Sequence, residues 1–526
     1  MDLDFKKIDQ KWQKKWEKSL KIDLSDNKNK FYCLTMFSYP SGSKLHVGHW
    51  YNYGPTDSYA RFMKMNGYNV FQPQGFDAFG LPAENFAIKH GIHPRESTDS
   101  NIKTMKEQLS SIGGMFNWDH EIRTCDKGYY KWNQWLFIQL FKNGLAYQKE
   151  ALVNWDPVDQ TVLANEQVLA DGTSDRSGAK VIQKPLKQWF FKITDYADEL
   201  LAFDNLDWPQ KTVSMQRNWI GKSVGGSIDF NISNSDDKIE VFTTRSDTIF
   251  GATYIVLSPE HSLVKKISTD PQIEEIEKYI KAAEDKNELQ RMDLTKEKTG
   301  VFTGAYAINP ANNKEIPIWI ADYVLTSYGT GAIMAVPAHD ERDQVFAVKY
   351  NLPIDLVVED RDHEGPPYSC LFEHGHCINS DFLNGLSTNQ AINKSLDWLE
   401  SEGIGKRQNN YRLRDWLISR QRYWGTPIPI VYDPNGKPHC VPEEHLPWVL
   451  PDDVEYKPKG TSPLGSSKEL IDRTESIFGK GWRPEIDTMD TFVCSSWYYL
   501  RYLDPNNSKE PFSKKYLNWM PVDCYV

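Results

Sequence analysis

The sequence has 526 residues, of which 40% are hydrophobic and 25% are charged. At roughly 150 residues per domain, this length allows about three or four domains. The composition excludes a mostly disordered chain, because such a chain lacks the apolar surface that offsets the entropy lost on ordering. The formal net charge of −11 excludes a wholly basic nucleic-acid coat, although a local basic face could still bind phosphates.

The cysteines and the N-terminus indicate a reducing compartment. Seven cysteines are scattered along the chain and none forms a Cys-x-x-Cys pair, which favours free thiols in a cytosol over a secreted disulfide framework. The residues after Met1 lack the apolar core of a signal peptide. No stretch reaches about 18 consecutive apolar residues, so no membrane span is expected. The predicted location is therefore cytoplasmic.

The first elements predict the start of a layered α/β domain. An amphipathic helix is indicated by apolar residues at helical spacing with lysines between them, namely Phe5, Ile8, Trp12 and Trp16. Its lysines are most simply a solvated face. The apolar run 31–37 predicts a strand, a loop follows at 39–42, and 46–61 has a helical pattern. This order is the opening unit of a doubly wound sheet, and 70–73 predicts its next parallel strand.

Later segments predict a second domain. Residues 100–145 have helical patterns. From 224 to 411 the sequence becomes rich in β-like runs, such as Ile239–Thr243 and Ala332–Val336, which indicates a separate domain inserted into the sheet domain. Residues 433–467 are rich in Pro, Gly and charge and predict a surface insertion.

A His-x-Gly-His motif occupies the first strand–helix junction. His46 and His49 lie three residues apart at a predicted helix N-terminus, where unpaired N–H groups and the helix dipole favour anions. Both imidazoles could donate to phosphate oxygens, and Gly48 would let a flat ring approach the backbone. Taken alone, the motif is equally consistent with two ordinary surface histidines.

Further motifs change this balance. Residues Met36 to Leu45 lead directly into the histidine motif, Gly75 to Glu84 follow further along, and Asp415 to Gly425 return the chain to the sheet domain. Together these segments resemble the class I aminoacyl-tRNA synthetases, and most closely the bacterial type of leucyl-tRNA synthetase. Relatives for isoleucine and valine usually carry Asp-x-His-Gly where this sequence has Asp77 to Gly80, which favours leucine.

The resemblance implies an α/β fold. It consists of a doubly wound, Rossmann-type parallel catalytic sheet, incomplete at its C-terminal end, and an inserted β-rich α/β editing domain. The implied divisions are 1–153 for the first half of the catalytic domain, 154–186 for a small hairpin module, 187–223 for a return to the catalytic domain, 224–411 for the editing domain, and 412–526 for the truncated second half, with a surface insertion at about 433–480.

The family activates an amino acid with ATP, which enters with Mg²⁺ as substrate, and then esterifies the terminal adenosine of its tRNA. Catalysis is mainly positioning and stabilisation of phosphate charge. The resemblance implies that His46 and His49 hold the ATP phosphates, beside Gly48 and Tyr39, and that Asp77 pairs with the ammonium group of leucine. The implied leucine site consists of Met36, Phe37, Tyr39, Asp77, Phe492, Tyr498 and Tyr525. For each aromatic residue, simple core packing is the alternative.

A second, hydrolytic site is expected, because an apolar pocket separates substrates that differ by one methylene by only about 1–3 kcal/mol. Two segments resemble the family's editing site, and the implied residues are Thr243, Thr244, Arg245, Asp247, Thr248, Met334, Asp340 and Asp343. Asp343 would anchor the amino group of a mischarged residue, and Thr248 would clash with a leucine side chain. Ser246 replaces a proline often found there, which is expected to loosen the turn.

No bound zinc is expected. Cys370, His374, His376 and Cys377 are too crowded for a closed tetrahedral site. Many relatives carry a zinc module near position 170, but 171–178 has no cysteine, so we expect the hairpin without the metal.

Other motifs are weaker still. Gly221-Lys222-Ser223 lacks the glycine that a phosphate loop needs at 216. Arg420 and Arg422 are candidates for tRNA or hinge contacts, ahead of the lysines of the first helix, which are Lys6, Lys7, Lys11, Lys14 and Lys15.

The sequence also lacks segments that the resemblance implies. The Gly-Gly-x-Glu-His segment, the Lys-Met-Ser-Lys-Ser loop and the anticodon-binding domain are not found. The expectation is a fragment, or one subunit whose second chain supplies the rest, with weak activation by this chain alone. The expected partners are tRNA(Leu), leucine and ATP. Two alternatives stay open: a stand-alone editing hydrolase that acts on aminoacyl-tRNA, and a non-catalytic module that binds tRNA or leucine.

Overall fold

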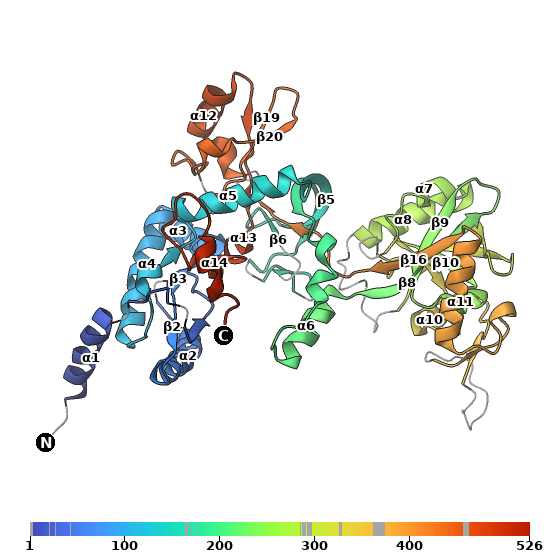
Figure 1. Ribbon diagram of the computed structural model, residues 1–526. Helices are drawn as coiled ribbons and strands as arrows, with labels where there is room; N and C mark the ends of the chain where they lie inside the picture. The colour runs from blue at the N-terminus through green and yellow to red at the C-terminus, as the bar shows by residue number, and fades with distance from the viewer. Residues whose placement is uncertain are drawn as a thin grey trace. The chain divides into compact units, whose positions relative to one another are not determined.

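The computed structural model describes residues 4–526 apart from 20, 27, 41, 43, 164–166, 170, 176, 285, 287–290, 292–296, 326–328, 361–373 and 456–461. The chain divides into two compact units (Figure 1). The first comprises Met1–Gln167, Lys184–Lys192 and Trp416–Val526, and the second comprises Val168–Gln183 and Ile193–Asp415. The second unit is therefore inserted, in two segments, into the sequence of the first.

A parallel sheet forms the centre of the first unit. Its strands run in the order β2-β1-β23, with β1 at Lys30–Leu34, β2 at Asn69–Phe71 and β23 at Cys524–Tyr525. Residues 31–34 of β1 are buried, as expected for a parallel strand that is covered on both faces. The strand predicted within 31–37 and its parallel neighbour near 70 are confirmed.

The order of these strands creates a site for ligands. A parallel bridge joins Ser38 to Phe76, and β3 (Gly75–Phe76) pairs in parallel with β4 (Ile122–Arg123). Strand β1 thus lies between β2, which follows it closely in the sequence, and β23, which comes only at residues 524–525. Doubly wound sheets bind ligands at such a reversal of strand order, outside the carboxyl ends of the strands.

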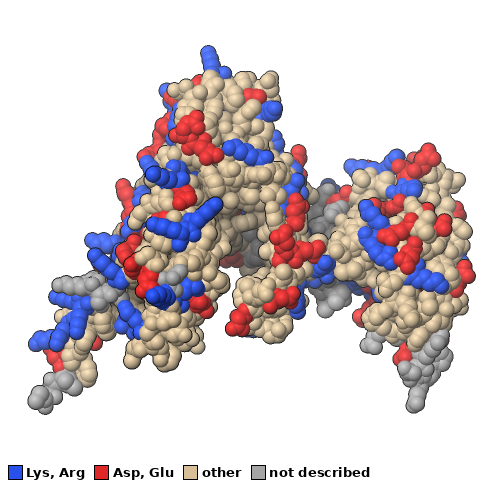
Figure 2. Space-filling view, in the orientation of Figure 1, with Lys and Arg blue, Asp and Glu red and all other residues tan. Residues whose placement is uncertain are grey.

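Helices cover this sheet. The helices before residue 145 are α1 (Phe5–Ser19), α2 (Val47–Met65), α3 (Leu81–His90), α4 (Pro94–Ser111) and α5 (Lys127–Lys142). The predicted helix α1 is confirmed. Phe5 at its start is 69% exposed, so the predicted apolar face is not buried there. Further along the helix, Trp16 packs against Arg61, whose guanidinium lies 4.3 Å from the centroid of the Trp16 ring. Lys6, Lys7, Lys11, Lys14 and Lys15 of α1 are exposed, and Figure 2 shows basic side chains gathered along this helix.

The remaining strands of the first unit form small antiparallel groups. One sheet has the order β17-β7-β5-β6, and the others are β20-β19-β21 and β18-β22. The bounds are β5 Ala146–Asp156, β6 Thr161–Leu163, β7 Ile182–Phe191, β17 Trp416–Leu417, β18 Ser419–Arg420, β19 Ile430–Tyr432, β20 Pro438–Cys440, β21 Arg483–Pro484 and β22 Thr488–Met489, with helices α12 Lys468–Phe478, α13 Thr491–Ser495 and α14 Tyr498–Arg501. The segment after residue 433 contributes buried Val441, Trp448 and Leu464 to the main core of this unit.

The second unit is built on a seven-stranded sheet of order β13-β10-β12-β11-β8-β16, with β9 also paired to β8. Its strands are β8 Ser223–Ile232, β9 Lys238–Thr243, β10 Tyr254–Leu257, β11 Gly300–Ile308, β12 Glu315–Ala321, β13 Ala332–Ala335 and β16 Gly405–Asn410, with the pair β14 Val358–Glu359 and β15 His376–Cys377. Its helices are α6 Gln210–Ile220, α7 Val264–Ile267, α8 Ile273–Glu284, α10 Glu341–Tyr350 and α11 Thr388–Ser401. The predicted β-rich texture is confirmed.

This unit has a core of its own, in which residues such as Ile228, Val241, Ile318 and Leu399 are fully buried. Strand β8 and the later strand β16 are antiparallel neighbours, with Ser223 opposite Asn410. The sheet therefore brings the beginning and the end of its own chain segment side by side.

Candidate functional site

Two histidines build the N-terminus of α2. His46 precedes the first turn, and its Nδ1 accepts a hydrogen bond from the backbone N–H of Gly48 at 3.0 Å. In return, Nδ1 of His49 accepts a hydrogen bond from the backbone N–H of His46 at 3.1 Å. The two ring centroids are 3.9 Å apart. Each imidazole thus satisfies a backbone donor that the helix leaves unpaired.

This capping fixes the chemistry of the two rings. Because each Nδ1 accepts a hydrogen bond, a neutral ring carries its proton on Nε2. Burial, together with the neighbouring His46, lowers the pKa of His49 and so favours its neutral form at pH 7. The helix end therefore offers two Nε2–H donors beside its positive dipole end, an arrangement that suits an anionic oxygen.

Gly48 has a defined steric role between the histidines. A Cβ at this position would lie 2.8 Å from Cε1 and 2.9 Å from Nδ1 of His46. The sequence predicted that Gly48 makes room for a flat ring, and in the structure that room is taken by the imidazole of His46. Glycine is needed here so that the ring can cap the helix.

Tyr53 and Ser38 connect this helix end to the sheet. The Tyr53 hydroxyl lies 2.6 Å from Oγ of Ser38 and donates to the Met36 carbonyl at 3.0 Å. The ring of Tyr53 lies 6.0 Å from that of His49. The carbonyl of Ser38 accepts a hydrogen bond from the Asp77 backbone N–H at 2.9 Å. The sequence analysis did not single out Tyr53 or Ser38 as site residues, although Tyr53 lies one turn beyond His49 on the same helix face.

Asp77 is a buried carboxyl group with an unpaired oxygen. Thr124 donates from Oγ1 to its Oδ1 at 3.1 Å, whereas Oδ2 has no partner in hydrogen-bonding geometry among the described residues. Burial raises the pKa of Asp77 to about 7, against the nearby hydroxyls of Thr124, Tyr39 and Ser495, which lower it. An ammonium group would supply the missing donors and restore the charged form.

An aromatic stack lies at the same end of the sheet. Phe37 stacks on Tyr498 with ring centroids 4.2 Å apart, and the Tyr498 hydroxyl donates to that of Tyr525 at 3.3 Å. The backbone of Met36 bonds to Val526 at 3.1 Å, which holds the β23 segment against β1. Phe492 is 55% exposed, and among the described residues it makes no ring contact with this stack. The structure thus brings Phe37, Tyr498 and Tyr525 together and leaves Phe492 apart from them.

The segment 415–425 supports the site from within the core. Glu84 accepts a hydrogen bond from the Trp424 backbone N–H at 2.7 Å, and Gly80 donates to the Trp424 carbonyl at 3.0 Å. Arg420 pairs with Asp490, and Arg422 donates to Thr161. Both arginines are buried and bond to internal partners, which argues against a direct contact with tRNA in this conformation. The alternative, that they act at a hinge, stays a prediction.

In the second unit, the predicted threonine-rich segment forms a tight turn after β9. Arg245 makes a bidentate ion pair with Asp247, both hydrogen bonds being 2.9 Å long, and the Thr248 hydroxyl donates to the Arg245 carbonyl at 2.8 Å. Thr243 accepts the Arg245 backbone N–H, whereas Thr244 is exposed. Strand β13, which carries buried Met334, lies against β9. The two predicted editing segments are therefore neighbours.

The structure differs from expectation at Ser246. Its side chain is fully buried, and Oγ of Ser395 on α11 donates to its Oγ at 2.8 Å. The hydroxyl anchors the turn to α11 in a way that proline cannot, which opposes the expected loosening.

Asp343 is the second buried carboxyl group with an unpaired oxygen. Its Oδ2 accepts a hydrogen bond from the Val336 backbone N–H at 2.9 Å, whereas Oδ1 has no hydrogen-bond partner among the described residues. Burial and the nearby Asp340 raise the pKa of Asp343 to about 8. Asp340 caps α10 by accepting from the backbone of Arg342 and Asp343, and it also pairs with the Arg342 guanidinium. Its geometry gives Asp340 a positioning role.

A metal ion would need several side chains that can bind it together. In the described parts of the chain no group of three or more His, Cys, Asp or Glu side chains is arranged to hold a metal ion. Cys370 of the crowded motif lies outside the described residues, and Cys377 is buried beside the Asp247 carbonyl. The cysteine-free segment near 170 forms antiparallel bridges between Val168 and Ser174 and between Thr173 and Lys180.

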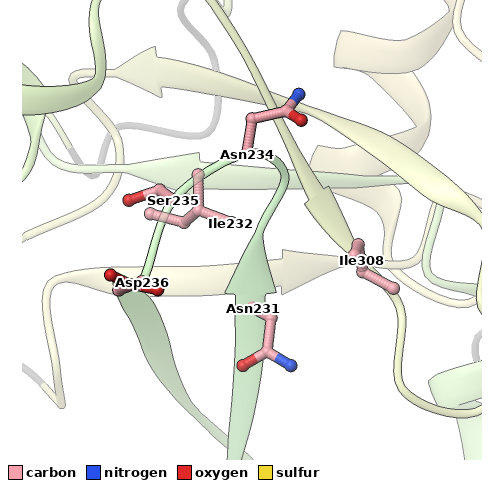
Figure 3. A pocket seen from close by; sticks show the side chains of 6 residues that line it. All are labelled: Asn231, Ile232, Asn234, Ser235, Asp236 and Ile308. Carbon is pink, nitrogen blue, oxygen red and sulfur yellow. The ribbon is translucent and has the colours of Figure 1, made fainter.

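A cavity of about 610 Å³ lies at the turn between β8 and β9. Figure 3 shows its lining, which is Asn231, Ile232, Asn234, Ser235, Asp236 and Ile308. It contains none of the predicted site residues. No described helix is long and apolar enough to cross a membrane.

Three family models match successive parts of the chain. They are described as tRNA synthetases class I (M) at residues 31–173, leucyl-tRNA synthetase, editing domain, at 217–400, and tRNA synthetases class I (I, L, M and V) at 388–524. This chain is 57% identical to a leucine–tRNA ligase of Clostridium botulinum and 56% identical to one of Clostridium perfringens. Each match covers 99% of this chain and 64% of the relative.

A solved structure supports the fold. The leucyl-tRNA synthetase of Agrobacterium radiobacter K84, solved as a ternary complex with tRNA and LeuAMS, matches 98% of this chain and 62% of that chain with a TM-score of 0.83 at 38% identity. The chain belongs to the leucyl-tRNA synthetase family. It spans about 64% of the length of the curated relatives it matches. The individual site residues and the domain boundaries at 153, 186, 223 and 411 remain predictions.

We expect Gly48→Ala to displace the His46 ring from the end of α2, because the new Cβ would overlap it. The readout is the ¹H–¹⁵N NMR spectrum of the imidazoles, in which Nδ1 of His46 should lose the signature of a hydrogen-bond acceptor. ATP affinity, measured by calorimetry, should fall about 10-fold if one phosphate donor is lost. Gly128→Ala, in a helix with open space around it, is the control. An unchanged His46 ring in Gly48→Ala would contradict the steric argument.

Asp343→Asn should stabilise the protein, and increasingly so as the pH rises from about 4 to about 8. In this window the folded state holds a proton on Asp343 that the unfolded state has released, so the free energy of unfolding of the parent falls with pH. Urea unfolding at several pH values measures the difference between variant and parent. Asp237, which is partly exposed and whose pKa is lowered by Lys266, provides the control variant Asp237→Asn. A difference that is constant with pH would refute the raised pKa.

Proposed function

We propose that this chain forms part of a leucyl-tRNA synthetase that activates leucine with ATP and transfers it to tRNA(Leu). The observation that carries the proposal is the pair of Nε2–H donors at the start of α2, which Tyr53 and Ser38 connect to buried Asp77, whose Oδ2 has no hydrogen-bond partner among the described residues. Identity of 57% to a leucine–tRNA ligase over 99% of the chain supports it. The relatives are longer, so a further polypeptide segment or a second chain completes the enzyme.

Activation is an in-line displacement. A leucine carboxylate oxygen attacks the α-phosphorus of ATP, which enters with Mg²⁺, and pyrophosphate leaves. His46 and His49 donate to phosphate oxygens, while Gly48 allows the capping geometry. Asp77 holds the ammonium group, so that the carboxylate is presented in one orientation. Met36, Phe37, Tyr39, Tyr498 and Tyr525 form the leucine and adenylate site, whereas exposed Phe492, which was also predicted for it, makes no ring contact with this stack among the described residues. Because the reaction uses tRNA, the proposed location is the cytoplasm.

The inserted unit hydrolyses mischarged tRNA(Leu). Asp343 binds the ammonium group of the esterified amino acid through its unpaired oxygen, and a water molecule attacks the ester carbonyl. Asp340, Arg245 and Asp247 hold the site in shape, with Thr243, Thr244, Thr248 and Met334 around the amino acid. A bulky leucine side chain is excluded at Thr248. No resident metal is required.

A stand-alone editing hydrolase is the second candidate function. The observation that favours it is the separate core of the second unit, which carries Asp343 and the 243–248 turn. This candidate predicts deacylation without any leucine-dependent chemistry on ATP.

Asp77→Asn should reduce leucine-dependent exchange of pyrophosphate into ATP by about two to four orders of magnitude, because loss of one partner of a buried ion pair costs about 3–5 kcal/mol. The assay uses this chain together with a polypeptide that supplies the remaining length of its relatives. The exposed residue Asp119 gives the control Asp119→Asn, which should leave exchange unchanged. Exchange that is absent even in the completed parent, with deacylation intact, would favour the hydrolase.

Asp343→Ala should abolish deacylation of tRNA(Leu) that carries an unbranched amino acid, while exchange with leucine is retained. The reason is that the variant loses Oδ1 of Asp343, a buried acceptor that has no hydrogen-bond partner among the residues that the structure describes. Release of radiolabelled amino acid measures the rate. Glu341→Ala, an exposed position on the same helix, is the matched control. Deacylation at the parent rate in Asp343→Ala would remove Asp343 from the editing site.

A further inference from the structure

Two cysteines face each other across the pair of strands at the centre of the first unit. Cys33 on β1 is the direct partner of Cys524 on β23 in the parallel ladder. Both are free thiols; Cys33 is fully buried, and Cys524 is partly exposed. They share one face of the sheet, in a cluster with Phe31, Ala60 and Met63. The two thiols were not part of the predicted site.

The distance between these positions suits a covalent link. Neighbouring strands lie about 4.7–4.9 Å apart, which falls within the range of about 4.4–6.8 Å that Cα atoms of disulfide-bonded cysteines adopt. The two thiols are in hydrogen-bonding contact, which favours ionisation of Cys524 and disfavours that of Cys33. The more exposed sulfur is therefore the more nucleophilic one, and a buried thiol stands beside it.

Other cysteines of the described chain lack this arrangement. Cys494 is buried and lies against Asn133 and Thr426, and burial raises its pKa. Cys440 is partly exposed, but burial raises its pKa and no second thiol contributes to that shift. The pair Cys33 and Cys524 thus combines access, thiolate character and a resolving partner.

We propose that Cys33 and Cys524 form a peroxide-sensitive thiol pair that closes into a disulfide and joins β23 covalently to β1. In the first step, the Cys524 thiolate attacks one oxygen of hydrogen peroxide, the O–O bond breaks, and protonation of the departing hydroxide gives water and a sulfenic acid. In the second step, Cys33 sulfur attacks the Cys524 sulfur, its proton is released, and the sulfenic oxygen leaves as a second water. Two thiols are oxidised and one peroxide is reduced.

The link acts on the aromatic end of the sheet. Leu34 and Tyr525 are the next register partners after the cysteines, and the Tyr525 hydroxyl contacts Tyr498, which stacks on Phe37. A disulfide closed over nearly the whole chain also restricts the unfolded state. Oxidation therefore fixes the β23 segment, with Tyr525 and its contact to Tyr498, against β1.

The test treats the reduced protein with hydrogen peroxide and maps its peptides without reduction. We expect one cross-linked peptide pair that contains Cys33 and Cys524, reversal by dithiothreitol, and an unfolding temperature a few degrees above that of the reduced protein. Cys33→Ser should leave a sulfenic acid on Cys524 that dimedone traps, and Cys524→Ser should leave Cys33 unmodified. Both variants should lose the rise in unfolding temperature.

Cys440→Ser is the matched control, since it removes a partly exposed thiol and should keep the cross-link. Peptides in which Cys524 is oxidised to the sulfinic acid with Cys33 still free would overturn the proposal. A cross-link that involves any other cysteine would overturn it as well. Because the assay needs no enzymatic activity, its result is independent of the synthetase proposal.

Discussion

The hydrogen bonds between two imidazoles and the first turn of α2 are the interaction on which the rest of the first site depends. They satisfy the free N–H groups of a helix end that would otherwise need water or a ligand, and they leave Nε2–H groups directed outward. Gly48 is compatible with this arrangement, whereas any larger residue would meet the His46 ring. Tyr53 and Ser38 connect the helix end by hydrogen bonds to the end of β1 and to the backbone of Asp77. The same two histidine side chains thus cap the helix and carry the N–H groups that are proposed to bind phosphate.

Asp77 in the first unit and Asp343 in the second are both buried carboxyl groups with only one oxygen held in a hydrogen bond among the described residues. In each, one carboxyl oxygen accepts a hydrogen bond from the protein, and the other is buried with no partner in hydrogen-bonding geometry among the described residues. Burial of an unsatisfied carboxyl group costs free energy, and the raised pKa values of about 7 and about 8 reflect that cost. A group that provides an ammonium donor recovers it. In the proposed function, both sites bind the amino end of an amino acid, although they have no residue in common.

Part of this arrangement could be predicted from the sequence. The run 31–37 followed by a glycine-bearing loop and His46 indicated a strand, a loop and a helix, because hydrophobic periodicity and capping residues are local signals. Residues that meet only in the fold could not be found this way. The contact between Ser246 and Ser395, the burial of Arg420 and Arg422, and the separation of Phe492 from the Phe37 stack depend on partners far away in the sequence. Cys33 and Cys524 are another such pair, and only the strand order brings them together.

The pairing of β8 with β16 has a consequence for how such a chain can be rearranged. Ser223 and Asn410 stand opposite each other, so the polypeptide between them begins and ends within one strand spacing. A segment with adjoining ends can be excised and the gap bridged by a tight turn, or be circularly permuted, with little change in the backbone on either side. A gene could therefore gain, exchange or lose the segment 223–410 in a single event.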